Sequence, residues 1–497
     1  MKTKTVFLFS LIFLCFLVSC DPDSPFAPEC ITTTTTMPPT DWTVMIYSAG
    51  DCNLSYYLLN DLAEIKNGTN NNMTVIALSD TNYNQNSNFC EAYKGTRLYQ
   101  IYNGIARRLN GGDILPEITF YEDVNLNTGD ADTFCRFVKY CKTYYPAKKY
   151  AVFVGGHGLG TYEEKNVSRS SGEPLKAMAI DYSSSSDWIF TAELTDAFEN
   201  DEPIDLLVLD CCNMGFAEVA YQYRPNNGSF NTKYMLASLQ QQISEGLCYD
   251  TIFANVTPTM SAADFGKLIL QKQKEYIISV TGIDDDPSSD IVTTNEIWSW
   301  SFSEIQSMAL YDCTKIESLK NAIDEAVPFL IGSNGLSLIQ NAAAQACGYW
   351  NHSSTTNSND FMYDIYNLFD YMANTTSDDI SDTARSAFAK VRNLADEVVV
   401  SSFLQREPHT VYTYPFENGK CGLAIFSPFY QYLWTQNLSY NAIEITAADG
   451  ISGYGNYAWC IDGCEPNNNE PENWFELLDS WFDINNNESG GRNHYQY

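Results

Sequence analysis

Two almost continuous apolar runs constrain the fold of this chain more than any other feature. The first spans residues 150–154, and the second spans residues 204–209 with Asp205 as its one charged residue. The first ends abruptly in Gly-Gly-His-Gly, and the second, after an aspartate, in Cys-Cys-Asn. Strands that are apolar on both faces are typical of a parallel sheet covered by helices on both sides. Because parallel strands present their carboxyl ends at one edge, we expect the residues after both runs to lie together there.

The region around these runs alternates strand-like and helix-like patterns. Strands are predicted over 42–47, 73–78, 150–154, 204–210 and 234–238, helices over 54–65, 130–144 and 214–223 with another opening at Thr191, and a hairpin-like region over 96–121. Such alternation predicts an α/β fold, in which a mostly parallel sheet is flanked by helices.

Beyond residue 254 the apolar residues recur at helical spacing. Helices are predicted over 261–276, 315–327, 361–372 and 382–400, and a strand over 422–426. We therefore divide the chain into a signal peptide over 1–20, a Pro/Thr-rich tether over 21–41, an α/β catalytic domain over 42–253, a helix-rich C-terminal subdomain over 254–464 and a polar tail over 465–497.

The amino terminus has the features of an export signal. Lys2 and Lys4 precede an apolar stretch over residues 6–18, which is too short for a permanent membrane span. The Leu-Val-Ser-Cys sequence ending at Cys20 resembles the cleavage box of bacterial lipoproteins, in which the cysteine receives lipid. We therefore expect an exported protein, lipid-anchored through Cys20 at the bacterial cell envelope, on the outer membrane or the surface. An ordinary secretory peptide is the alternative.

The net charge and the cysteine content bear on three questions: nucleic-acid binding, disulfides and zinc. The formal net charge of −34 argues against nucleic-acid binding, because such a surface repels phosphate. Fifteen cysteines in an exported protein predict some disulfides, with Cys460 and Cys464 close enough to staple a local loop. Zinc is the weaker interpretation of that pair, because the chain has four histidines and no repeated Cys-x-x-Cys.

An imidazole and a thiol on neighbouring strand ends are the minimal set for nucleophilic catalysis by cysteine. His157 follows the first apolar run and Cys212 follows the second. Asp51, Asp80 and Asp181 also close predicted strands at this edge. They either shape the cleft or bind a cation, although capping the following turn is the commoner reason for such aspartates.

Four strings resemble successive blocks of the clostripain family of cysteine peptidases. They are WTVMIYSAGDCNLSYYLLNDLAEI, YYPAKKYAVFVGGHGLG, AMAIDYSSSSDWIFTAELTDAF and DLLVLDCCNMGFAEVAYQYR. GKCGLAIFSPFY, near residue 425, is similar to a further block, so the match extends thinly across nearly the whole mature chain. The resemblance implies a caspase-type α/β fold.

The resemblance also implies roles for single residues. His157 matches the catalytic histidine, Cys212 the nucleophile, and Asp210 the acidic residue that lines a pocket for Arg or Lys. Backbone N–H groups of Gly158 and Cys212 would hold the oxyanion. The implied partners are protein or peptide substrates, and we expect a monomer. The chemistry needs no cofactor or metal, and calcium stays open as an additional ion.

Departures from the family pattern affect two expectations: which cysteine is the nucleophile, and which residues bind a basic side chain. Cys211 stands where the family has a small residue, so two thiols compete, and the register to Asp210 favours Cys212. Ser238, a substrate-binding candidate, is followed by Leu-Gln-Gln-Gln where the family has acidic residues. Glu245 is the candidate that would replace those acids in binding a basic side chain.

Two further hypotheses come from the polar interval before residue 177 and from the two glycines before His157. The polar interval before residue 177 offers Arg169 or Lys176 as a self-processing site, since some family members cut themselves there. Gly155 and Gly156 replace bulkier or acidic residues before the histidine. That change keeps an alternative function open, namely a catalytically inactive, tethered binding or adhesion lipoprotein of the same fold.

Overall fold

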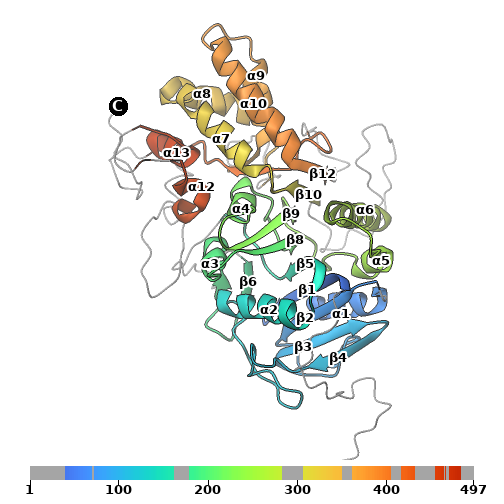
Figure 1. Ribbon diagram of the computed structural model, residues 1–497. Helices are drawn as coiled ribbons and strands as arrows, with labels where there is room; N and C mark the ends of the chain where they lie inside the picture. The colour runs from blue at the N-terminus through green and yellow to red at the C-terminus, as the bar shows by residue number, and fades with distance from the viewer. Residues whose placement is uncertain are drawn as a thin grey trace, which may run out of the picture.

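The computed structural model describes residues 40–69, 72–161, 178–281, 306–349, 361–404, 416–430, 454–463, 465 and 470–482 (Figure 1). The predicted signal peptide with Cys20, nearly all of the tether, Arg169, Lys176 and Cys464 lie outside the described residues. Among the helices that are described, none has the length and apolar character needed to cross a bilayer.

Within the described residues, nine strands form one sheet in the order β12-β10-β9-β8-β5-β1-β2-β3-β4 (Figure 1). The five central strands are parallel: β9 (Phe230–Ser238), β8 (Glu202–Asp210), β5 (Ala147–Gly155), β1 (Thr40–Gly50) and β2 (Thr74–Thr81). The flanking strands are antiparallel: β10 (Ser307–Asp312) and β12 (Val399–Leu404) beside β9, and the hairpin β3 (Gly95–Tyr102) and β4 (Ile105–Leu109) beside β2. The predicted α/β fold is confirmed.

Helices cover both faces of the central strands, which explains why those strands are apolar throughout. Helices α1 (Ser55–Gly68), α5 (Tyr249–Asn255) and α6 (Ala262–Thr281) pack on one face, and α2 (Ala131–Tyr144), α3 (Thr191–Asp196) and α4 (Ala217–Gln222) on the other (Figure 1). Alternate residues of β1 enter the two cores, with Val44 and Ile46 in the first and Met45 and Tyr47 in the second. A small hairpin, β6 (Met178–Asp181) and β7 (Asp187–Ile189), follows β5 in the described chain.

The C-terminal half contributes to the main sheet as well as adding helices. Because β10 and β12 belong to that sheet, the sheet crosses the predicted boundary at residue 253. The added elements are α7 (Ile316–Ala326), η2 (Val327–Phe329), α8 (Gly332–Ala343), α9 (Ile365–Asn374), α10 (Asp382–Val398), η5 (Tyr454–Asn456), α12 (Ala458–Ile461) and α13 (Trp474–Phe482). In Figure 1, α7 to α10 stand beyond the β10–β12 end of the sheet. The predicted strand near residue 425 is β13 (Ala424–Phe426), which pairs with β11 (Met362–Asp364) in a separate two-stranded sheet.

No disulfide joins two of the cysteines that the structure describes: Cys52, Cys90, Cys135, Cys141, Cys211, Cys212, Cys248, Cys313, Cys347, Cys421 and Cys460. Most of these cysteines are buried, where a thiol packs as a small apolar side chain. Cys464 lies outside the described residues, so the predicted link between Cys460 and Cys464 stays a prediction.

Candidate active site

The register of β5 and β8 places the two predicted catalytic residues at one edge of the sheet. These strands are parallel neighbours, and Gly155 at the end of β5 is paired with Asp210 at the end of β8. His157 follows its strand end by two residues, and so does Cys212. The imidazole and the thiol therefore leave adjacent strands at the same level.

Gly158 brings the two loops into direct contact. A Cβ atom built on Gly158 would lie 2.5 Å from the carbonyl oxygen of Cys212 and 2.6 Å from Cβ of Cys211. Both distances are far below van der Waals contact, so any side chain at this position would push the loops apart. Glycine after the histidine is thus required for the two loops to lie side by side.

Contacts from two other elements orient His157. Its Nε2 lies 2.6 Å from Oδ1 of Asn53, in the turn that follows β1. An amide oxygen at this position can accept from an Nε2–H, which is present in one neutral tautomer and in the imidazolium. The backbone oxygen of His157 accepts a hydrogen bond from the N–H of Ala179 at 3.1 Å, and its ring centroid lies 6.1 Å from that of Trp188. The β6–β7 hairpin therefore packs against the histidine.

The two adjacent cysteines occupy different environments. Cys211 is 1% exposed, and its Sγ faces the carbonyl oxygen of Val154 at 3.4 Å. Burial raises the pKa of the Cys211 thiol well above its usual value. Cys212 is partly exposed, and its Sγ accepts a hydrogen bond from the N–H of Gln242 at 3.3 Å. Cys212 is thus the thiol that a substrate can reach.

Backbone hydrogen bonds fix the loop that carries Cys212. The N–H of Asn213 donates to the oxygen of Gln240 at 3.0 Å, and Asn213 has a left-handed φ of 57°. The N–H of Gly215 donates to the oxygen of Ser238 at 2.8 Å, and the oxygen of Gly215 accepts from Ala424 at 3.0 Å. The last contact comes from β13, so this strand supports the loop that carries Cys212.

Buried Glu218, on α4, connects this part of the structure to β13 and η5. Its Oε1 accepts from the N–H of Phe426 at 2.9 Å and from the hydroxyl of Tyr454 at 2.8 Å. Burial raises the pKa of Glu218 to about 7.

Asp210, at the end of β8, lies near a second buried carboxylate, that of Asp61. It is 6% exposed, and its Oδ2 accepts a hydrogen bond from the hydroxyl of Tyr249 at 2.7 Å. A Cβ on Gly246 would lie 3.0 Å from that Oδ2 and 3.3 Å from Oδ2 of Asp61 on α1. The two carboxylates therefore converge on the backbone of Gly246.

Burial raises the pKa values of both carboxylates. Burial raises the pKa of Asp210 to about 6. Burial and then the neighbouring charges of Asp210, Glu64 and Glu245 raise the pKa of Asp61 well above its usual value. Glu245 thus lies near Asp61, and its role in binding a basic side chain stays a prediction. Ser238 is different, because its buried hydroxyl donates to the oxygens of Gln240 and Ser307 and supports the turn after β9.

The aspartates that close the strands gather beside this edge. Oxygens of Asp51, Asp80 and Asp181 lie within 4.8 Å of one another, and all three residues are buried. Three hard oxygen donors suit a calcium ion. They also accept internal hydrogen bonds, among them Thr128 Oγ1 to Asp80 at 2.8 Å and Thr128 N–H to Asp181 at 3.0 Å. Both predicted roles, cation binding and turn capping, are chemically compatible with this arrangement.

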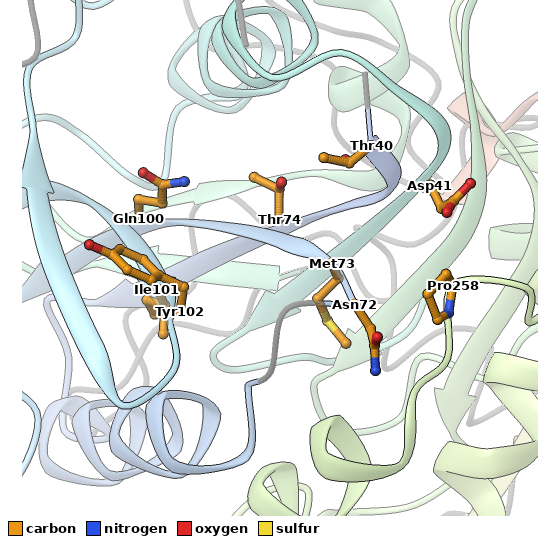
Figure 2. A pocket seen from close by; sticks show the side chains of 9 residues that line it. All are labelled: Thr40, Asp41, Asn72, Met73, Thr74, Gln100, Ile101, Tyr102 and Pro258. Atoms are coloured by element: carbon orange, nitrogen blue, oxygen red, sulfur yellow. The ribbon is translucent and has the colours of Figure 1, made fainter. Parts of the chain in front are cut away.

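A hollow of about 390 Å³ lies at the opposite edge of the sheet (Figure 2). It is lined where β1 and β2 begin and β3 ends, by Thr40, Asp41, Asn72, Met73, Thr74, Gln100, Ile101, Tyr102 and Pro258. The length of β2 alone, roughly 25 Å at about 3.3 Å per residue, separates it from the end where His157 lies. These lining residues include no thiol or imidazole, so the hollow is not part of the candidate active site.

Sequence reasoning missed three residues of the site. Asn53 contacts His157, Asp61 faces Asp210 across Gly246, and Tyr249 donates to Asp210. Asn53 and Asp61 both lie in the first family-like string, and Asn53 follows the strand next to β5. A polar residue at the carboxyl end of that neighbouring strand was the available signal.

The chain is similar in sequence to known cysteine peptidases. The model of the clostripain family matches residues 46–462. Clostripain of Hathewaya histolytica is 32% identical over 479 residues, which cover 92% of this chain and 89% of that protein.

Solved structures share the fold at low sequence identity. An inactive zymogen of a C11 protease from Parabacteroides distasonis is 17% identical with a TM-score of 0.54, covering 86% of this chain and 99% of that one. A secreted C11 cysteine protease from Bacteroides thetaiotaomicron, in complex with an irreversible peptide inhibitor, is 16% identical with a TM-score of 0.52. The match covers 78% of this chain and 92% of that one.

Proposed function

The chain belongs to the clostripain family and is a cysteine peptidase, and from that premise we propose that it is an endopeptidase that cleaves after arginine or lysine with His157 and Cys212 as its catalytic pair. The observation that carries this proposal is the pairing of Gly155 with Asp210, from which both residues follow at equal distance. The two buried carboxylates of Asp210 and Asp61, which approach Gly246 together, support the basic preference.

The proposed reaction uses these groups in sequence. The Cys212 thiolate attacks the carbonyl carbon of the scissile bond, and the N–H groups of Gly158 and Cys212 stabilise the oxyanion. His157 donates a proton to the departing amine, which leaves a thioester on Cys212. His157 then takes a proton from a water molecule that attacks the thioester and releases the carboxylic acid. Asn53 holds the imidazole through both steps by its contact with Nε2.

The basic preference follows from the charge of the pocket. Asp210 and Asp61 converge near the nucleophile, and Glu245 adds to the negative potential at Asp61. Charge-assisted hydrogen bonds from a substrate guanidinium or ammonium would offset the desolvation of these carboxylates.

Fluorogenic peptides that end in Arg, Lys, Asn or Leu test the proposal. We expect cleavage of the Arg and Lys peptides, loss of that cleavage after thiol alkylation, and loss in Cys212→Ala but not in Cys211→Ala. Alkylation-insensitive cleavage, or equal cleavage of the Leu peptide, would contradict it. If none of the four peptides is cleaved, the result favours the alternative function, a catalytically inactive binding module.

We also propose that the protein is exported and anchored by lipid on Cys20. The sequence of the amino terminus supports this, and one neighbour of the same fold is a secreted protease. Metabolic labelling with a fatty acid tests it: label in the wild type and none in Cys20→Ser is the expected result, and unlabelled wild type contradicts it.

A further inference from the structure

The three glutamines after β9 replace the acidic residues of the family pattern, and the catalytic pair does not explain them. The last of them, Gln242, donates its backbone N–H to Sγ of Cys212 at 3.3 Å. A sulfur accepts such a hydrogen bond more strongly as a thiolate than as a thiol, because the acceptor then carries the charge. The contact therefore favours the form of Cys212 that attacks a carbonyl group.

One buried side chain holds the backbone on both sides of Gln242. Gln306 is 3% exposed and comes directly before β10, the antiparallel neighbour of β9. Its Oε1 accepts from the N–H of Ile243 at 3.3 Å, and its Nε2 donates to the backbone oxygen of Gln241 at 3.1 Å. Because an amide has an acceptor end and a donor end, this single side chain fixes both neighbours of Gln242. It thereby fixes the direction of the N–H between them.

The turn before the glutamines is attached to the same two parts of the structure. The hydroxyl of Ser238 donates to the backbone oxygens of Gln240 and Ser307, at 2.7 and 2.9 Å. The oxygen of Gln240 also accepts from the N–H of Asn213, the residue after Cys212, at 3.0 Å. The loop after β9 is thus joined to β10 on one side and to the loop that carries Cys212 on the other.

We propose that Gln306 is a positioning residue of the active site, which holds the N–H of Gln242 against the Cys212 sulfur and so favours the thiolate. This inference rests on the proposed function, because it takes Cys212 as the nucleophile. Gln306 acts through the backbone of the loop after β9 and does not itself contact the substrate.

Other groups also influence the charge of Cys212. In the described loops next to it, the titratable groups are Asp210, Cys211, His157 and Glu245. Gln242 and Gln306 carry no charge, so substitutions at these two positions leave those groups in place. A change in the ionisation of Cys212 in such variants therefore reports the hydrogen bond.

The test is the rate at which iodoacetamide alkylates Cys212 between pH 5 and 9, measured without substrate. Mass spectrometry follows the peptide that contains it, and fragment spectra separate Cys212 from Cys211. In Gln306→Leu the pH of half-maximal rate should rise by about one unit, so that alkylation at pH 6 slows about tenfold. At pH 9 the rate should change little, because the thiol is ionised there in both proteins.

Two variants at position 242 separate the N–H from the side chain. Gln242→Pro removes the N–H and should give the same upward shift, whereas Gln242→Ala keeps it and should match the wild type. An equal shift in both variants would overturn the inference, because the side chain would then be responsible. If Gln242→Pro does not fold, as judged by circular dichroism, Gln306→Leu decides.

Gln273→Leu is the matched control. Gln273, on α6, is 2% exposed; it accepts from the N–H of Cys248 and donates to the oxygen of Gly246, both at 3.0 Å. It thus makes the same two kinds of bond to a different loop, and its replacement should leave the pH of half-maximal alkylation unchanged. If folded Gln306→Leu keeps the wild-type pH dependence, or if Gln273→Leu shifts it equally, the role of Gln306 is refuted and the proposed function stands. Failure of the wild type to cleave any test peptide would contradict the proposed function alone.

Discussion

The amide oxygen of Asn53 lies 2.6 Å from Nε2 of His157, although the two residues belong to loops after different strands. The amide oxygen is an acceptor for an Nε2–H, so this contact holds the imidazole in one orientation. Tyr182 donates to the same amide oxygen at 3.3 Å. We propose that Asn53 is a positioning residue, which acts on the reaction through the histidine.

We predict that Asn53→Ala lowers kcat about tenfold with little change in KM, because an unheld imidazole spends less time in the productive orientation. The variant should also shift the acidic limb of the pH profile of kcat/KM, which a purely structural role would not move. Steady-state kinetics between pH 5 and 9 measure both effects. A rise in KM at constant kcat would show that Asn53 binds substrate instead.

The stability of the protein should fall as the pH rises from about 4 to 7. Burial raises the pKa of Asp80 and of Glu218 to about 7 and that of Asp210 to about 6. In the unfolded chain these groups lose their protons near pH 4, whereas the folded protein keeps them until pH 6 to 7. The free energy of unfolding therefore falls as the pH rises through this interval, and these groups lower it no further above pH 7.

Glu218→Gln tests this pH dependence at one position. Each pKa unit corresponds to about 1.4 kcal/mol, so the variant should gain up to roughly 3 kcal/mol over the wild type at pH 8 and little at pH 4. Urea unfolding at both pH values, in a Cys212→Ala background, measures this difference in the free energy of unfolding. The control is Glu117→Gln, because hydrogen bonds from its own backbone and from Arg136 lower the pKa of Glu117 despite its slight burial. Equal pH dependence in the wild type and Glu218→Gln would contradict the assignment.

Calcium should raise the melting temperature through the three aspartates that close the strands. Carboxylates within 4.8 Å of one another repel unless a proton or a cation lies among them. We expect a shift of several degrees on adding calcium after chelation, and none in Asp51→Asn. An unchanged wild-type melting temperature would leave turn capping as their role.

Self-processing is predicted in the interval that holds Arg169 and Lys176. On a denaturing gel, the purified wild type should separate into two fragments, and Cys212→Ala should remain one chain. Changing both basic residues to alanine should also leave one chain if the cut is made by this protein at these positions. Identical migration of the wild type and Cys212→Ala as intact chains would exclude it.

The carboxyl ends of β5 and β8 could be located from sequence, because two apolar runs that stop abruptly leave little choice of where the strands end. The added strand β12 could not, since it follows α10 directly and its first two residues fell within the predicted helix over 382–400. The identity of the accessible thiol was also open, because Cys211 and Cys212 differ in burial and not in type. Asp61 was hidden for a related reason: on a helix it looks like a surface acid until α1 packs against Gly246 and Asp210.

The most direct test of the account is the site of covalent labelling by an irreversible peptide inhibitor that ends in arginine. Mass spectrometry of the digested wild-type protein should place the adduct on Cys212, and the His157→Ala variant should react far more slowly. An adduct on Cys211, or equal labelling without the imidazole, would contradict the assignment of His157 and Cys212 as the catalytic pair.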